Sequence, residues 1–216
     1  GFQALSRMFM SGLNIKVFVL DTQVYSNTGG QASTSSYTGQ NTKMSVHGKA
    51  VFGKQERRKE IAQIAMMHPG VYVAQTTCAH VNHFYKSVLG ALEYPGPAIV
   101  SCYTTCQPEH GVADNMAAEQ ARLAVDSRAF PLLIYDPRAG DTIKSRLSLQ
   151  GNPNVKGDWY IHPKTGKEIT FIDFARTEGR FAKHFDKDGN PSEVLLAANQ
   201  DRLQNWRLLQ ELAGLR

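Results

Sequence analysis

The sequence has few cysteines and no long apolar run. No stretch approaches the roughly 20 apolar residues that a membrane-spanning helix needs, and no signal peptide is recognisable. The three cysteines among 216 residues, Cys78, Cys102 and Cys106, are too few and too unevenly spaced for a disulfide framework. Cysteine used in this way fits a reducing interior. We therefore expect a cytoplasmic protein with no membrane partner.

Several ligand-binding signatures are also missing. The G-x-G-x-x-G fingerprint of dinucleotide sites does not follow any expected strand, and there is no Walker A loop. Helix-turn-helix, zinc-finger and RNP signatures are absent. The formal charge of +5 comes from 24 basic and 19 acidic residues that are scattered along the chain. The one short mixed run, Lys54–Lys59, is typical of a solvated helix start. We expect no nucleic-acid partner, and a basic binding or assembly module stays as the alternative outside enzymes.

What is present is an alternation of buried strands and amphipathic helices. It predicts an α/β fold with a doubly wound, mostly parallel sheet. Strands are expected at 17–20, 71–75, 98–103 and 131–135, and helices at 2–11, 58–67, 81–93 and 115–127. The first strand is predicted to be buried on both faces. Residues 32–56 form a long polar loop or a short helix around 43–51. A polar stretch with a hairpin near 160–169 leads to two closing helices, 171–184 and 191–214.

The first strand ends in a cluster of oxygen-bearing side chains and glycines. Val17-Phe18-Val19-Leu20 runs into Asp21, Thr22, Ser26 and Asn27, then into a pair of glycines. Open α/β sheets bind ligands at this end of a strand. Magnesium takes oxygen ligands from hydroxyl, amide and backbone carbonyl groups. Thr22, Asn27 and a carbonyl between them make a magnesium–diphosphate site plausible, whereas Asn, Ser, Thr and Gly also dominate ordinary turns.

The chain begins at Gly1 without an initiator methionine. Phe2, Leu5 and Phe9 already follow a helical spacing. We expect the chain to be a piece of a longer polypeptide.

Residues 20–31, Leu-Asp-Thr-Gln-Val-Tyr-Ser-Asn-Thr-Gly-Gly-Gln, resemble the thiamine diphosphate loop of the pyruvate:ferredoxin (flavodoxin) oxidoreductases, members of the 2-oxoacid oxidoreductase family. Further blocks follow in order: 32–33, 48–49, 71–75, 94–97 and 131–137. The resemblance implies a thiamine-diphosphate-binding α/β domain over residues 1–138. Residues 139–216, which match only loosely, are expected to be a polar connection and a helical extension of the same domain.

The resemblance also implies residue roles. Thr22 would give its hydroxyl and Val24 its backbone carbonyl to Mg²⁺. Asn27 would lie beside the diphosphate and the reacting thiazolium, as the catalytic residue. The turn over the phosphates would be shaped by Thr28, Gly29 and Gly30. In the family a Gly-Asp-Gly motif upstream supplies the magnesium-binding aspartate. That motif is absent here, so this chain alone should bind metal and thiamine diphosphate poorly and be inactive.

The cysteines receive different interpretations. Cys106 matches the position at which the pyruvate enzymes carry the fourth ligand of a [4Fe-4S] cluster, whose other ligands would come from elsewhere. Cys102 lies within a strand and is expected in the core. Cys78 with His80 and His83 has a spacing that could suit zinc, but a helix start with exposed histidines is favoured. Asp186–Asn190 is interpreted as a turn rather than a calcium loop.

By resemblance, the parent enzyme decarboxylates a 2-oxoacid, pyruvate above all, oxidatively with coenzyme A. The electrons would leave through iron–sulfur clusters to ferredoxin or flavodoxin. The expected partners are the remaining domains or subunits of the enzyme, as a homodimer. A non-redox thiamine diphosphate decarboxylase or synthase is the alternative among enzymes.

Overall fold

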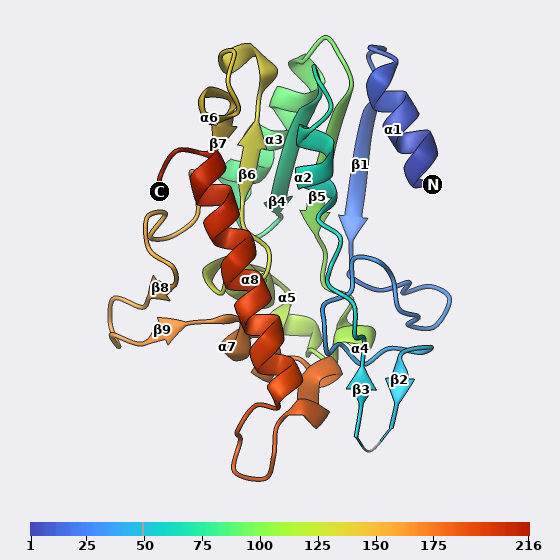
Figure 1. The fold of residues 1–216 in the computed structure, drawn as a ribbon, viewed down its shortest axis with the longest axis vertical. Coiled ribbons are helices and arrows are strands. Elements are labelled where there is room, and N and C mark those ends of the chain that lie inside the picture. The colour runs from blue at the N-terminus through green and yellow to red at the C-terminus, as the bar shows by residue number, and fades with distance from the viewer. Residues whose placement is uncertain (49) are drawn as a thin grey trace.

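The computed structural model describes residues 1–48 and 50–216, and its centre is a five-stranded sheet. The strand order is β1-β5-β4-β6-β7 (Figure 1). These strands are β1 (Lys16–Asp21), β5 (Ala98–Tyr103), β4 (Tyr72–Thr77), β6 (Leu133–Tyr135) and β7 (Leu147–Ser148). β1, β5 and β4 are parallel, whereas β6 is antiparallel to β4 and β7 is antiparallel to β6. The predicted α/β class with a parallel-rich sheet is confirmed.

The antiparallel edge was not evident from the sequence. β6 contributes three residues, and β7, which the sequence left inside a polar connection, pairs with it through Ile134 and Tyr135. A strand of three residues takes its direction from the hydrogen-bond pairing with its neighbour, here β4. Sheets that mix parallel and antiparallel strands are common.

The three parallel strands differ in burial. All six residues of β4 and all six of β5 are buried, as expected for apolar runs at the centre of a sheet. β1 lies at the sheet edge, where Phe18 is 47% and Leu20 is 71% exposed. The prediction that this strand is buried on both faces is therefore wrong, because among the described residues only β5 pairs with it and the face that carries Phe18 and Leu20 is uncovered.

Helices cover the two faces of the sheet (Figure 1). α1 (Phe2–Met10), α2 (Ile61–Met66) and α8 (Glu193–Leu212) pack on one face, and α3 (Val81–Glu93) packs on the other. The strand residues alternate accordingly. The α2 and α8 side buries Val71, Val73, Ile99 and Leu133, and the α3 side buries Tyr72, Ala74, Ala98, Val100 and Ile134.

A third core lies beyond the carboxyl ends of the parallel strands (Figure 1). It joins α5 (Ala117–Asp126), α7 (Phe171–Arg176), the 3-10 helix η3 (Gly179–His184) and the start of α8. Its aromatic members are Tyr37, Tyr103, Phe130, Phe171, Phe174 and Phe181. The Tyr37 hydroxyl donates to the Ala129 carbonyl over 2.9 Å. This core anchors the chain that follows the glycine-containing loop.

The remaining elements are short. They are α4 (Gln107–His110), η1 (Asp114–Met116), η2 (Pro137–Ala139) and α6 (Ile143–Arg146). The hairpin expected near 160–169 is confirmed as β8 (Tyr160–Ile161) and β9 (Glu168–Ile169). The segment interpreted as a loop or short helix contains the hairpin of β2 (Val46–His47) and β3 (Phe52–Gly53), and Lys49 within it lies outside the described residues. Within the described ranges no helix is long and apolar enough to cross a membrane.

Candidate functional site

The strand-end turn, residues Asp21–Val24, brings two oxygen atoms together. The Thr22 hydroxyl donates to the Val24 carbonyl oxygen over 2.8 Å. Gln23 between them has φ +53°, the left-handed region, and this folds the backbone so that both oxygens meet. Neighbouring ligands of an octahedral magnesium ion lie about 3 Å apart, since each Mg–O bond is about 2.1 Å. The pair of oxygens therefore has the spacing of two magnesium ligands.

Four neighbours hold Gln23 in this unusual conformation. Its backbone N–H donates to Asp21 Oδ1 over 3.0 Å. Its carbonyl accepts from the Ser36 hydroxyl at 2.6 Å and from Gln40 Nε2 at 2.9 Å. Arg180 Nη2 donates to its side-chain Oε1 over 3.3 Å. Since Gln23 is fully buried, this network offsets the cost of a left-handed residue that is not glycine.

The acid that ends β1 is already engaged. Arg58 Nη2 binds Asp21 Oδ2 over 2.5 Å, and both side chains are buried. Burial alone would disfavour the charged guanidinium, but Asp21 and Glu60 outweigh it and hold the pKa of Arg58 above its ordinary value. Asp21 thus stabilises the turn and is not a free ligand.

The glycine loop, residues Tyr25–Gln31, closes on itself after the turn. The Tyr25 N–H donates to the Gln31 carbonyl and the Gly30 N–H to the Tyr25 carbonyl, each over 3.0 Å. Gly29 and Gly30 have φ +98° and +78°, values that favour glycine. The residues at the tip, Asn27 and Thr28, are exposed. The loop is therefore closed at its base by hydrogen bonds, and its tip is exposed to solvent.

Two charged side chains lie against the glycines of the loop. The position of a Cβ on Gly29 would be 2.6 Å from Lys43 Nζ. The Glu109 carboxylate occupies the place that a Cβ on Gly30 would need. The sequence alone assigned no site role to Lys43 or Glu109. No local pattern could have paired them with glycines 14 and 79 residues away, because the tertiary fold alone makes these contacts.

Cys106 lies at the N-cap of α4, half-buried and free. Four residues on, His110 Nε2 is 2.7 Å from the Thr22 carbonyl oxygen. Burial and the neighbouring Arg180 lower the pKa of His110 to about 2, so the imidazole is neutral and Nε2–H donates. This hydrogen bond connects the strand-end turn to the helix that begins at Cys106.

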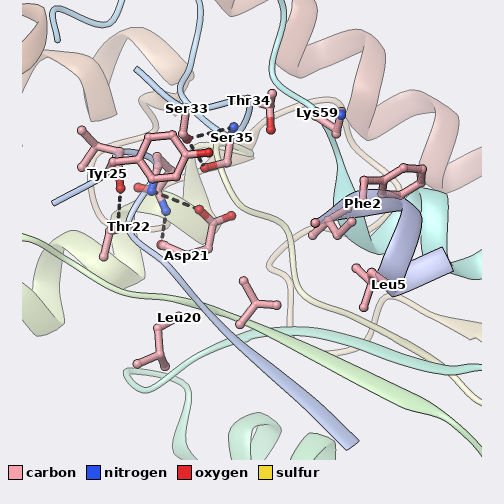
Figure 2. Close-up of a pocket in the computed structure, with 15 residues that line it drawn as sticks. Phe2, Leu5, Leu20, Asp21, Thr22, Tyr25, Ser33, Thr34, Ser35 and Lys59 are labelled. Carbon is pink, nitrogen blue, oxygen red and sulfur yellow. Dashed lines mark hydrogen bonds between the residues drawn. The ribbon is translucent and has the colours of Figure 1, made fainter. Parts of the chain in front are cut away.

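A cavity of about 380 Å³ opens beside the strand-end turn (Figure 2). Its polar end is formed by Thr22, Val24 and the run Ser33–Ser35, and its apolar end by Phe2 and Leu5 at the start of α1. Figure 2 shows Thr22 and Tyr25 at one end and Phe2 with Leu5 at the other. Such a cavity suits a ligand with one charged end and one apolar part.

The other residues singled out in the sequence have structural roles. Cys102 is buried in β5, as predicted. His80 and His83 are half-buried rather than exposed as expected, because their Nδ1 atoms are in hydrogen bonds to Thr77 and Thr76, at 3.0 and 2.9 Å. Within residues 1–48 and 50–216 no group of three metal-binding side chains is assembled. The predicted turn at Asp186 is confirmed, because Asp186 Oδ1 accepts from two backbone N–H groups downstream.

Comparisons with known proteins address the same segment. Residues 1–102 match the family model of the thiamine pyrophosphate enzyme C-terminal TPP binding domain. The whole chain is 34% identical to 16% of a pyruvate-flavodoxin oxidoreductase from Rhodospirillum rubrum. It is 38% identical, over 99% of its length, to 17% of a probable pyruvate-flavodoxin oxidoreductase from Escherichia coli. It is 39% identical, over its full length, to 11% of a pyruvate dehydrogenase [NADP(+)] from Cryptosporidium parvum.

The chain thus spans about a sixth of the length of the pyruvate-flavodoxin oxidoreductases that it matches. The identity extends beyond the family-model match and includes residues 139–216, which the sequence alone aligned only loosely. The chain belongs to the pyruvate:ferredoxin (flavodoxin) oxidoreductase family, and its first 102 residues lie in the C-terminal thiamine pyrophosphate binding domain.

Proposed function

We propose that this chain provides the magnesium and diphosphate end of a thiamine diphosphate site in a 2-oxoacid oxidoreductase that acts on pyruvate. The observation that carries the proposal is the 2.8 Å separation of Thr22 Oγ1 and the Val24 carbonyl oxygen at the wall of the cavity. The match of residues 1–102 to a thiamine pyrophosphate binding domain supports it. The names of the relatives support pyruvate as the substrate and flavodoxin as an electron acceptor.

In this proposal the ligands divide between the turn and the loop. Thr22 and Val24 hold Mg²⁺, and the aspartate of the family's Gly-Asp-Gly motif completes the site from outside residues 1–216. Asn27 lies beside the diphosphate and the thiazolium. The loop over the phosphates is formed by Thr28, Gly29 and Gly30. The first turn of α1 lines the same cavity.

The bound cofactor supplies the nucleophile and the electron sink of the oxidative decarboxylation. The residues of this chain hold its charged end and orient it. The strand-end turn presents two oxygens that need no rearrangement, because Gln23 is already locked in the required conformation. Such preorganisation is what a binding site gains from buried support.

Cys106 is proposed as one ligand of a [4Fe-4S] cluster through which the electrons leave. A half-buried free thiol at the start of a short helix is accessible to a metal centre. The contact of His110 with Thr22 holds this helix against the turn, and this supports a cluster position beside the cofactor end of the sheet.

The remaining partners follow from the same proposal. Coenzyme A accepts the acyl group, and ferredoxin or flavodoxin accepts the electrons. The other domains or subunits of the enzyme supply the substrate pocket, within a homodimer. Under this proposal the 216-residue chain alone is inactive.

The metal assignment is tested by Thr22→Val in the natural full-length protein. This change removes one oxygen and keeps the β-branched shape. We expect the magnesium dependence of thiamine diphosphate binding, measured by calorimetry, to weaken at least about tenfold, roughly 1.4 kcal/mol. Thr38→Val makes the same change outside this cavity and should bind as the wild type does. Equal magnesium dependence in the two variants would contradict the assignment.

The cluster assignment is tested by Cys106→Ala in the same protein. The iron content should fall by one cluster per chain, and the visible absorption should decrease in proportion. Cys78→Ala removes an exposed thiol and should leave the iron content unchanged. Full iron content in Cys106→Ala would rule out the ligand role.

A further inference from the structure

A second cavity of about 310 Å³ lies beside the glycine loop. Its lining includes Gly30, the run Asn41 to Lys43, Glu109 and Arg180. It shares no lining residue with the cavity beside the strand-end turn. Of the residues that line this cavity, the proposed magnesium and diphosphate site uses Gly30 alone, so the polar side chains of the cavity have no role in that site.

Three buried polar atoms in the walls of this cavity have no hydrogen-bond partner. Among the described residues they are Asn41 Oδ1, Thr42 Oγ1 and Arg180 Nη1. Arg180 is fully buried, and its other nitrogens are engaged. Nε binds Glu178 Oε2 over 2.5 Å, and Nη2 donates to Gln23. An unmade hydrogen bond of a buried group costs about 1–3 kcal/mol, and more for a charged group, so the two unpartnered donors, Arg180 Nη1 and the Thr42 hydroxyl, indicate an occupant that accepts from them.

The charges at the cavity specify the kind of occupant. Arg180 and Glu178 neutralise one another, whereas Lys43 and Glu109 have no ion-pair partner within the part of the chain that the structure describes. The donors are Arg180 Nη1, the Thr42 hydroxyl and the Lys43 ammonium. The acceptors are the Glu109 carboxylate and Asn41 Oδ1. An occupant must therefore accept several hydrogen bonds and also donate at least one.

We propose that this cavity is a binding site for hydrogen phosphate. Its deprotonated oxygens accept from Arg180, Thr42 and Lys43, and its remaining proton is donated to Glu109. Sulfate carries no proton at neutral pH, so the Glu109 carboxylate would repel it. A phosphate monoester, whose second pKa is near 6, also has no proton to donate there. The carboxylate thus selects free inorganic phosphate over both.

Phosphate bound in the second cavity also stabilises the strand-end turn. Arg180 is the side chain common to the second cavity and to Gln23, the residue that positions Thr22 and Val24. A phosphate on Nη1 completes the pairing of this guanidinium and stabilises the arrangement that Nη2 supports. Phosphate is therefore a stabilising ligand of the turn, bound at a place separate from it.

The experiment compares three anions on the natural full-length protein at matched ionic strength. Calorimetry should give saturable binding of inorganic phosphate and no binding of sulfate or glycerol phosphate. Thr42→Val removes one donor and should weaken phosphate binding at least tenfold, while the free variant is as stable as the wild type, because the lost hydroxyl had no partner. Lys43→Gln, at an exposed side chain, should weaken it similarly. Thr38→Val is the control outside the cavity and should bind phosphate normally.

Glu109→Gln tests the selectivity. An amide can donate to an oxyanion, so sulfate should bind this variant about as tightly as phosphate does. The proposal is overturned if the wild type does not bind phosphate, or if Thr42→Val and Lys43→Gln bind it unchanged. Competition between phosphate and thiamine diphosphate with magnesium would also overturn it, since one site would then explain both. Loss of thiamine diphosphate binding in Thr22→Val with phosphate binding retained would show that the two sites are independent.

Discussion

The strand-end turn and the tip of the glycine loop are adjacent in the chain but are held in different ways. The turn is buried, and its partners come from three segments further along the chain, around residues 36–40, 58 and 180. The tip, Asn27 and Thr28, is exposed, and its loop is closed by hydrogen bonds among residues 25–31. The oxygen pair of the turn thus depends on the tertiary fold, whereas the base of the loop is closed by its own backbone and is held from outside at Gly30 by the Lys43 N–H.

The largest effect on stability should come from breaking the buried ion pair between Asp21 and Arg58. Asp21→Ala leaves the Arg58 guanidinium buried without its main partner. We expect a loss of about 3–5 kcal/mol in the free energy of unfolding, measured by urea denaturation. Asp186→Ala, in a surface turn, is the control and should cost far less. Similar losses in the two variants would mean that the turn is not supported by burial.

Acid should weaken the turn through His110. Its pKa is lowered to about 2 in the folded chain and is near 6.5 when unfolded, so the unfolded state takes up the proton first. The stability due to its neutral form is complete above pH 6.5 and is lost progressively as the pH falls toward 2. Between pH 7 and 5 the loss is about 2 kcal/mol.

The measurement is the unfolding free energy of the wild type and of His110→Gln at both pH values. His110→Gln should remove most of the loss between them, because glutamine does not titrate. His47→Gln changes an exposed histidine and should keep the wild-type pH dependence. A steep acid loss that persists in His110→Gln would exclude His110 as its source.

A smaller effect is expected within the glycine loop. Gly30→Ala forces a residue with a Cβ to adopt φ +78° and displaces the Glu109 carboxylate. We expect a loss of about 1–2 kcal/mol, because the side chain of Glu109 can move away from the new methyl group. Gly166→Ala has a similar φ, +67°, and no neighbour at its Cβ position, so it isolates the backbone cost. The difference between the two thermal midpoints measures the contact with Glu109.

The smallest effect on stability should come from the tip. Asn27→Ala removes an exposed side chain and should change the free energy of unfolding by less than about 0.5 kcal/mol. The same variant should weaken thiamine diphosphate binding in the full-length protein if the tip faces the cofactor. A large loss of stability in Asn27→Ala would abolish the contrast between turn and tip.

Much of the fold could be predicted because its signals are local. The apolar runs at 71–75 and 98–103 became the buried strands β4 and β5, and the amphipathic segment 81–93 became α3 with the same bounds. The exposure of Phe18 and Leu20 could not be predicted, because a short apolar run has the same sequence pattern whether its strand lies at the centre or at the edge of a sheet. The pairing of β6 and β7 depends on which strand each one meets, and no local pattern encodes that.

The sequence by itself determined the chemistry of the loop. Thr22, Asn27 and the glycine pair lie within nine residues, so their order and spacing are local properties that a motif can carry. Only the tertiary structure decided that the Thr22 hydroxyl meets the Val24 carbonyl, that His110 joins the turn to the Cys106 helix, and that Arg180 reaches Gln23. The physical reason is that a left-handed Gln23 is costly in isolation. It persists because buried partners up to 157 residues away in sequence make up that cost through hydrogen bonds formed only when the chain is folded.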